Sequence, residues 1–314
     1  MTRFAIDERS YWLPHLTADA VASQIASLLD LMEECQQAGH GICYDQDLIL
    51  QPIWDGSTFW ELFERADLPL LDIDREKAAI QFSTLIFWDE TREQQPTELD
   101  VSVAGGPDEA SGTIAWAHAQ ADRGIEAAAC ITSGVTRPIG RQAVQIGGGP
   151  AKAVWFVDDS VRKTNYIRDL IAQHARNVEE FGSLAAEAFA DLKFMEGCFG
   201  GIRDMSRAVQ QIAPDLVRHL SVLSDEGAAI FAGPWQNAPA QFAAFGVNIS
   251  DENGNTKQNA KARRERTLTV DGQELLFWWH TKIAPDRDRI HIHPDGVAAG
   301  RPILVGIFCR HLTN

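Results

Sequence analysis

The stretch Trp278-Trp279-His280-Thr281-Lys282, followed by Arg289-Ile290-His291-Ile292-His293, governs the interpretation of this chain. Side chains two residues apart in a β-strand lie on the same face of the sheet. We therefore expect Arg289, His291 and His293 to share one face, with His280 and Lys282 beside them on the preceding strand. The alternation predicts a surface of cations and imidazoles near the end of the chain.

Four strands are expected around this stretch, at residues 266–270, 273–282, 289–293 and 303–309. Asp271-Gly272 is a strong signal for a two-residue hairpin turn. The strands predict a compact antiparallel sheet. Its candidate core residues are Leu275, Phe277, Ile290, Ile292, Val305 and Ile307.

The sequence as a whole predicts an α+β protein in three parts. Residues 1–160 form an acidic α/β-type region, in which helices alternate with short apolar strands. Residues 161–225 read as a helical linker or bundle, broken near Pro214. Residues 226–314 form the basic antiparallel module. Residues 89–112 are acidic and aperiodic, and predict a long surface loop.

Composition and charge limit the classes of function. The chain has 314 residues, 45% of them hydrophobic, and a net charge of −16. Residues 255–314 carry ten Lys/Arg against six acids, so the acidity lies in the rest of the chain. This asymmetry indicates either a C-terminal part that faces a polyanion or an acidic domain beside a mildly basic one.

Other compositional features predict a cytoplasmic protein. No apolar run reaches the length of about 20 residues that a membrane span needs, and the first residues lack a signal-peptide core. The five cysteines are scattered and form no Cys-x-x-Cys pair, which favours reduced thiols. We expect no membrane association, no cofactor and no metal.

The loop Gly147-Gly148-Gly149-Pro150-Ala151-Lys152 has two interpretations. A glycine-rich loop followed by lysine suggests phosphate binding. It lacks the Gly-Lys-Ser/Thr ending, however, and a strand follows where a helix is required. A hairpin or connecting turn is the favoured interpretation.

The C-terminal surface fits metal-independent RNA cleavage. Histidine can act as acid and base near neutrality, while arginine and lysine stabilise phosphate charge. The candidate catalytic residues are His280, Lys282, Arg289, His291 and His293. The candidate nucleic-acid-binding residues are Lys257, Lys261, Arg263, Arg264, Arg266, Arg287, Arg310 and His311.

Two alternatives remain for the same residues. His291-x-His293-x-Asp295 matches the first part of a metallo-hydrolase pattern, although position 296 is glycine. The other alternative is structural: these are half-buried strand residues paired with Asp286, Asp288 or Glu274.

The module resembles RelE/HigB-type messenger-RNA interferase toxins, which carry Lys, Arg and His on a small antiparallel sheet. It is also similar to the C-terminal module of uncharacterised bacterial defence-island proteins, in the motifs His280-Thr281-Lys282, Arg289-Ile290-His291 and residues 305–312. The resemblance covers about residues 220–314. It departs from the toxin pattern because an acidic domain of about 200 residues precedes the sheet, whereas these toxins are usually small and basic.

The first hypothesis is therefore a toxin-like endoribonuclease effector in stress response or antiphage defence, acting on RNA or ribosome-associated RNA. The second is a non-catalytic nucleic-acid- or protein-binding component of a bacterial defence complex, which contacts a protein through the acidic N-terminal region. The third is a metal-dependent hydrolase.

Overall fold

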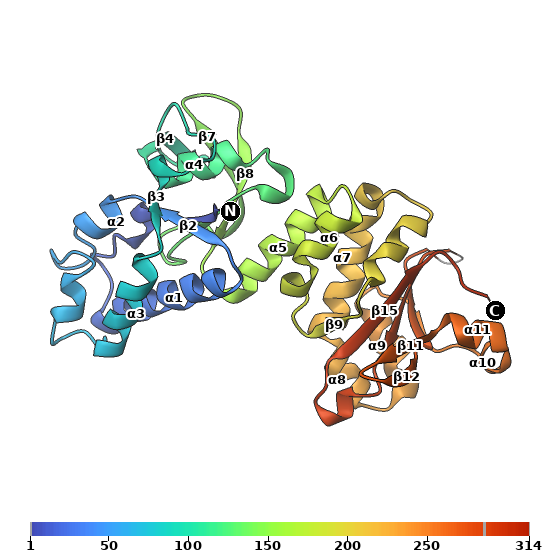
Figure 1. Ribbon diagram of the computed structural model, residues 1–314. Coiled ribbons are helices and arrows are strands. Elements are labelled where there is room, and N and C mark those ends of the chain that lie inside the picture. Colours follow the sequence, from blue (N-terminus) through green and yellow to red (C-terminus); the bar gives the residue numbers. More distant parts are fainter. Residues whose placement is uncertain (1, 285–286, 314) are drawn as a thin grey trace. The chain divides into compact units, whose positions relative to one another are not determined.

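The computed structural model describes residues 2–284 and 287–313 and has an α+β fold (Figure 1). The chain divides into two compact units, Met1–Tyr166 and Ile167–Asn314. The residues predicted as a helical linker lie mostly in the second unit, together with the C-terminal sheet. Within the described residues, no helix combines the length and apolar character needed to cross a membrane.

The first unit is built on an eight-stranded sheet in the order β3-β2-β1-β6-β8-β7-β4-β5. The first five strands in this order run parallel, and the last three are antiparallel additions. Their bounds are β1 Thr2–Ile6, β2 Gly41–Tyr44, β3 Ile86–Phe87, β4 Asp100–Val103, β5 Glu109–Ala110, β6 Ala129–Ile131, β7 Gly140–Ile146 and β8 Lys152–Val157.

Two helices cover this sheet. Helix α4 (Gly112–Gln120) is buried along nearly its whole length and packs with Ala5 and Cys130 in one apolar core. Helix α1 (Ala18–Gln37) lies on the other side of the parallel strands (Figure 1). Its buried face has the expected spacing of Val21 and Ile25, and the Thr17 hydroxyl accepts from the N–H of Ala20 at its start. The remaining helices of this unit are η1 Glu8–Tyr11, α2 Asp47–Leu50, η2 Glu61–Glu64, α3 Asp72–Phe82, η3 Trp88–Glu90 and η4 Gly124–Glu126.

The structure decides two interpretations of the sequence in this unit, those of residues 89–112 and of the glycine-rich stretch 147–151. Residues 89–112 are not one loop, because Val101 and Val103 are buried in β4 and pair with β7. The glycine-rich stretch 147–151 joins β7 to its antiparallel neighbour β8, so it is a hairpin connection. The phosphate-loop interpretation is therefore wrong, since no helix follows the glycines.

The second unit contains a five-stranded sheet in the order β10-β13-β14-β15-β9, in which β9 runs parallel to β15. A separate two-stranded hairpin, β11-β12, turns at Asp271 and Gly272, both with positive φ, as the sequence predicts. The bounds are β9 Leu192–Phe194, β10 Ile249–Ser250, β11 Thr267–Val270, β12 Gln273–Leu276, β13 Trp279–Lys282, β14 Arg289–His293 and β15 Ile303–Cys309.

The predicted strand 273–282 is therefore two strands in two different sheets, interrupted at Phe277 and Trp278. The Phe277 ring packs over Gly306, where a Cβ atom would lie only 2.5 Å from the ring. The chain passes from the hairpin to the larger sheet here: the Phe277 N–H donates to the Arg266 carbonyl at 2.9 Å, whereas Trp279 pairs with Ile292 of β14. The predicted four-stranded meander is thus a mixed five-stranded sheet with a hairpin folded beside it.

Helices complete the second unit. They are α5 Ser160–His174, which begins in the first unit, and α6 Val178–Ala188, η5 Cys198–Asp204, α7 Val209–Asp225, α8 Gly227–Ala232, η6 Trp235–Asn237, α9 Ala238–Ala244, α10 Gly254–Gln258, α11 Ala260–Glu265 and η7 Val297–Ala299. Helix α7 runs through Pro214 without the predicted break. Pro214 is the sixth residue of this helix and lacks a backbone N–H, so the helix continues past it with one backbone hydrogen bond fewer.

Candidate functional sites

Strands β13 and β14 bring most of the predicted catalytic residues together. The antiparallel register pairs His280 with His291 and Lys282 with Arg289. The two imidazole ring centres are 5.1 Å apart. The sequence alternation therefore predicted correctly which side chains share a face.

The predicted open surface is wrong for the two paired histidines. His280 is 3% exposed and His291 is fully buried, whereas Lys282, Arg289 and His293 are half-buried. Arg266 and Glu252 lie against this face. A phosphate has no open approach to these two rings, because side chains from the segment before β11 cover them.

The same burial keeps these imidazoles neutral. Burial, together with the charge of Arg289, lowers the pKa of His280 to about 3. Burial and the neighbouring His280 lower the pKa of His291 well below its usual range. Histidine catalyses proton transfer near neutrality only if both protonation states are accessible. This premise of the ribonuclease hypothesis is not met at His280 and His291.

The histidine rings instead hold the backbone around the break between β12 and β13. The Nδ1 atoms of His291 and His293 lie 3.0 and 2.9 Å from the carbonyl oxygens of Phe277 and Leu276. Each ring donates to its carbonyl and so satisfies a group that leaves the strand ladder. These contacts favour the structural interpretation of the histidines, with carbonyls in place of the expected carboxylates as their partners.

The carboxylates proposed as partners of these histidines are Asp288, Glu274 and Asp286. Asp288 accepts from the backbone and side chain of Ser206. Glu274 is exposed on β12. Asp286 lies outside the described residues.

The metal site that the sequence offered as an alternative, at His291, His293 and Asp295, is not formed. The Asp295 carboxylate is exposed and lies 3.9 Å from His293 Nε2. Within the described chain, the histidine, cysteine and acidic donors close enough to hold one ion are those of Glu252, His280 and His291.

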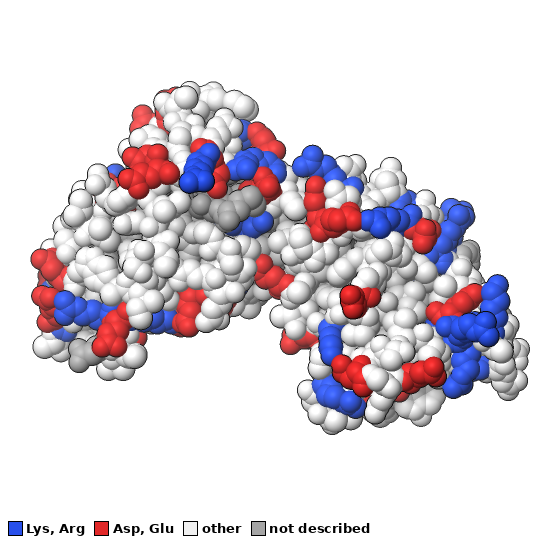
Figure 2. All heavy atoms as spheres, in the orientation of Figure 1, with Lys and Arg blue, Asp and Glu red and all other residues white. Residues whose placement is uncertain are grey.

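The predicted nucleic-acid-binding residues separate into buried and exposed groups. Arg266 is 1% exposed and forms an ion pair with Glu252 at 2.8 Å, so its assignment to a binding surface is wrong. Lys257 is half-buried and forms an ion pair with Asp251 at 2.6 Å. Five of the others are exposed on α11, before β14 and near the chain end: Lys261, Arg263, Arg264, Arg287 and Arg310, with His311 beside them in sequence and also exposed. Figure 2 shows Lys and Arg side chains gathered over the α10–α11 end of this unit.

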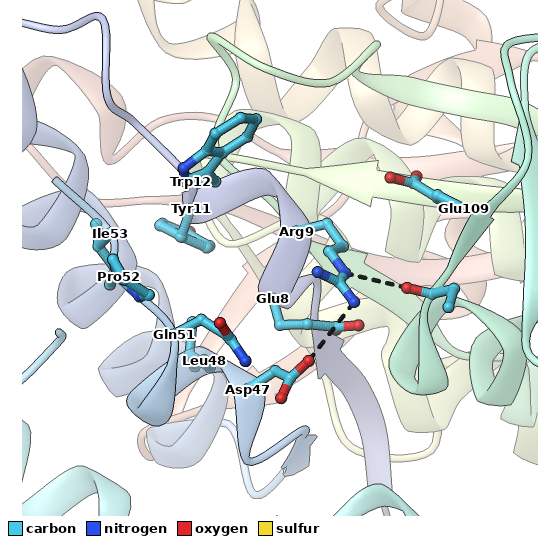
Figure 3. Close-up of a pocket in the computed structure, with 11 residues that line it drawn as sticks. Glu8, Arg9, Tyr11, Trp12, Asp47, Leu48, Gln51, Pro52, Ile53 and Glu109 are labelled. Atoms are coloured by element: carbon cyan, nitrogen blue, oxygen red, sulfur yellow. Dashed lines mark hydrogen bonds and ion pairs between the residues drawn. The ribbon is translucent and has the colours of Figure 1, made fainter. Parts of the chain in front are cut away.

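A second candidate site lies in the first unit, at the carboxyl ends of its parallel strands. Strands β2 and β6 flank β1 on opposite sides, so the chain order reverses at β1. Open α/β sheets bind ligands in the crevice at such a reversal. A pocket of about 560 Å³ lies here, and Figure 3 shows its residues, which come from η1, α2 and β5, from Trp12 directly after η1 and from the segment after α2.

The pocket combines apolar walls with polar groups at one end. Trp12 is 65% exposed at its rim, and Ile53 and Leu48 supply apolar surface. The Arg9 guanidinium spans between the carbonyl of Ala110, at 3.0 Å, and the Asp47 carboxylate, at 3.5 Å (Figure 3). An apolar cavity with a few polar groups is the usual form of a ligand or partner site.

Glu8 forms the floor of this pocket and is buried. Its carboxyl group accepts from the hydroxyl of Thr113 at the start of α4. Burial, with the charge of Asp7, raises the pKa of Glu8 to about 8. A strongly perturbed carboxyl group in a cleft is a functional-site signal.

The neighbouring Asp7 carries an internal counter-ion. Arg137 Nε donates to its carboxylate at 2.7 Å, and the same guanidinium contacts Glu109. The sequence interpretation missed this edge of the sheet. The available signal was two acids directly after the apolar run Phe4-Ala5-Ile6, where a parallel strand ends.

Comparison of the chain with protein-family models, with curated proteins and with solved structures gave no match. The two candidate sites are therefore interpreted from their geometry and chemistry.

Proposed function

We propose that this protein is a non-catalytic binding component whose N-terminal unit receives a partner protein in the pocket beside Trp12. The observation that carries the proposal is the pocket itself. It lies at the carboxyl edge of a parallel sheet, has an exposed tryptophan at its rim, and has apolar walls. Exposed tryptophans beside pockets are typical anchors of protein interfaces.

Charge indicates the chemistry of the partner. Residues 1–166 carry 26 acidic against 12 basic side chains, a net charge of −14. Such a field attracts positively charged partners and repels polyanions. We therefore expect a basic partner segment that inserts an aliphatic or aromatic side chain between Trp12 and Ile53.

A random peptide library displayed on phage tests this proposal with the whole protein as bait. We expect enrichment of peptides that flank an apolar residue with Lys or Arg. Trp12→Ala should abolish capture of these peptides, and Asp47→Asn should weaken it. The matched controls are Ile80→Ala and Asp89→Asn, at exposed positions outside the pocket, and both should bind as the parent does. Enrichment that survives Trp12→Ala would reject the pocket as the binding site.

Nucleic-acid binding by the second unit is the other candidate function, and the exposed arginines of α11 favour it. Arg263 and Arg264 are exposed, and no carboxylate in the described chain forms an ion pair with either. The Glu265 side chain accepts from Thr313, which holds the end of the chain against α11. Arg310 and His311, which precede Thr313 in the chain, are exposed as well.

Titration of labelled RNA and DNA at increasing salt tests this candidate. Arg263→Gln with Arg264→Gln should weaken binding and reduce its salt dependence, because each phosphate contact releases counter-ions. Arg176→Gln, at an exposed position elsewhere in the unit, is the control. The same samples test RNA cleavage, which stays a prediction: products that disappear in Lys282→Ala would favour the ribonuclease, and intact RNA favours binding alone.

A further inference from the structure

Three side chains in the second unit converge on a buried point that the proposed function does not use. Glu252 comes from the segment between β10 and α10, His280 from β13 and His291 from β14. One donor atom of each lies within 4.8 Å of the others. The three side chains are at most 8% exposed, so solvent screens their interaction with an ion only weakly.

His291 supplies the observation that points to a ligand. Its Nδ1 lies 3.0 Å from the Phe277 carbonyl oxygen, which can only accept, so the ring proton is on Nδ1. Nε2 then carries a lone pair, and it has no hydrogen-bond partner although it is buried. A buried acceptor without a partner loses its hydration and gains no hydrogen bond in return, so this atom indicates a bound group.

His280 offers its other ring nitrogen. Its Nδ1 lies 3.3 Å from the Trp278 carbonyl oxygen, which can only accept, and 3.6 Å from Glu252 Oε1, so the ring proton is on Nδ1. Nε2 then keeps a lone pair, and its hydrogen-bond neighbour is the Ser250 hydroxyl at 3.2 Å. An ion would take this lone pair in place of the hydroxyl.

Arg266 is the group that opposes a cation here. Its Nε donates to Glu252 Oε1 at 3.0 Å, and its Nη1 donates to the carbonyls of Ala262 and Thr313. It therefore fixes the carboxylate in the way that outer-shell donors orient metal ligands. Its positive charge also lowers the affinity for any cation. The site consequently requires an ion that bonds strongly to imidazole nitrogen, which excludes Ca²⁺ and Mg²⁺ and favours Zn²⁺.

We propose that Glu252, His280 and His291 form a binding site for a zinc-type divalent ion that links β13 and β14 to the segment after β10. Two imidazoles and one carboxylate are a common protein ligand set for this ion, and they leave its fourth position for water. The ion would give His291 Nε2 its missing partner. The inference is independent of the pocket beside Trp12, which lies in the other unit.

Metal titration of the full chain tests the proposal. The protein is treated with a chelator, the chelator is removed, and CoCl₂ or ZnCl₂ is added. We expect one equivalent of Co²⁺ to bind with the visible absorption of a tetrahedral nitrogen–oxygen site and without a thiolate charge-transfer band. The same equivalent of Zn²⁺ should displace Co²⁺ and raise the melting temperature.

Two variants and a matched control locate the site. Glu252→Gln keeps the side-chain shape and an oxygen for Arg266, and His291→Leu removes the free nitrogen. Each should weaken Zn²⁺ binding at least tenfold, a difference of about 1.4 kcal/mol. His293→Gln, two residues along the same strand, should bind as the parent does. The proposal fails if the folded parent binds no Co²⁺ at stoichiometric concentration, or if Glu252→Gln and His291→Leu both keep full affinity.

Discussion

The buried carboxyl group of Glu8 makes the stability of the first unit depend on pH in a direction that can be predicted. A rise in pKa from 4.5 to about 8 corresponds to about 5 kcal/mol of preference for the neutral form. Between these two values the folded chain holds a proton that the unfolded chain has lost. The free energy of unfolding therefore falls as the pH rises through this range, and this loss is complete above about pH 8.

Glu8→Gln removes the titration while keeping a neutral side chain of the same size beside Thr113. At pH 5 we expect the variant and the parent to unfold with nearly equal free energy. At pH 9 the variant should be more stable by several kcal/mol, up to about 5, because only the parent must bury a charge. For a unit of this size, such a difference corresponds to a rise in melting temperature on the order of 10 °C.

Scanning calorimetry of the full chain at both pH values is the assay, since it separates the transitions of the two units when they unfold independently. Glu76→Gln, at an exposed position on α3, is the control and should shift neither transition by more than about 0.5 kcal/mol. An equal effect of Glu8→Gln at pH 5 and pH 9 would refute the reasoning, because Glu8 would then not titrate in this range.

Three further predictions concern the second unit, and urea unfolding measures each. Arg266→Met should destabilise the unit by about 3–5 kcal/mol, because it leaves the buried Glu252 carboxylate unpaired; an effect under about 1 kcal/mol would contradict the buried pair. Gly201→Ala should lower the free energy of unfolding by about 3 kcal/mol, since the new Cβ would lie 1.8 Å from the carbonyl oxygen of Phe308. Gly200→Ala is the control, because a Cβ at that position meets no atom within 4 Å. Burial lowers the pKa of His219 to about 4, so the free energy of unfolding of the parent falls as the pH drops from 6.5 towards 4. In His219→Gln this free energy should fall by about 3 kcal/mol less over the same range. Equal losses in the parent and the variant would contradict the lowered pKa of His219.

The period of two in the C-terminal sequence predicted which residues are neighbours but not what covers them. The hairpin turn at Asp271-Gly272, the pairing of β13 with β14 and the buried Ile290 and Ile292 all agree with the sequence interpretation. Alternation assigns side chains to two faces of a sheet and carries no information on which face meets solvent. Arg266 decides this for the histidine face, and it comes from a segment that reads as a solvated basic stretch in the sequence.

Short strands are the other limit of the sequence interpretation. Strands β1, β4 and β5 are two to five residues long, and the acidic residues 89–112 have no strand-like alternation overall. Val101 and Val103 become buried only because β7, forty residues later, pairs with them. The carboxyl edge that holds Glu8 exists only after such non-local pairing, so the two acids after Phe4-Ala5-Ile6 are a local signal that does not by itself mark a site.

The two candidate sites differ in how their buried polar groups are balanced, and this difference separates their roles. In the first unit Asp7 has the guanidinium of Arg137 as its counter-ion, and Glu8 relieves the remaining charge by holding a proton. The adjoining pocket is therefore close to neutral inside while its unit is strongly acidic, a combination that attracts a basic partner yet accepts an apolar anchor. In the second unit Arg266 balances Glu252, but His291 Nε2 keeps a lone pair without a partner. A neutral pocket open to solvent suits a protein segment, whereas a closed point with an unsatisfied nitrogen suits a single ion.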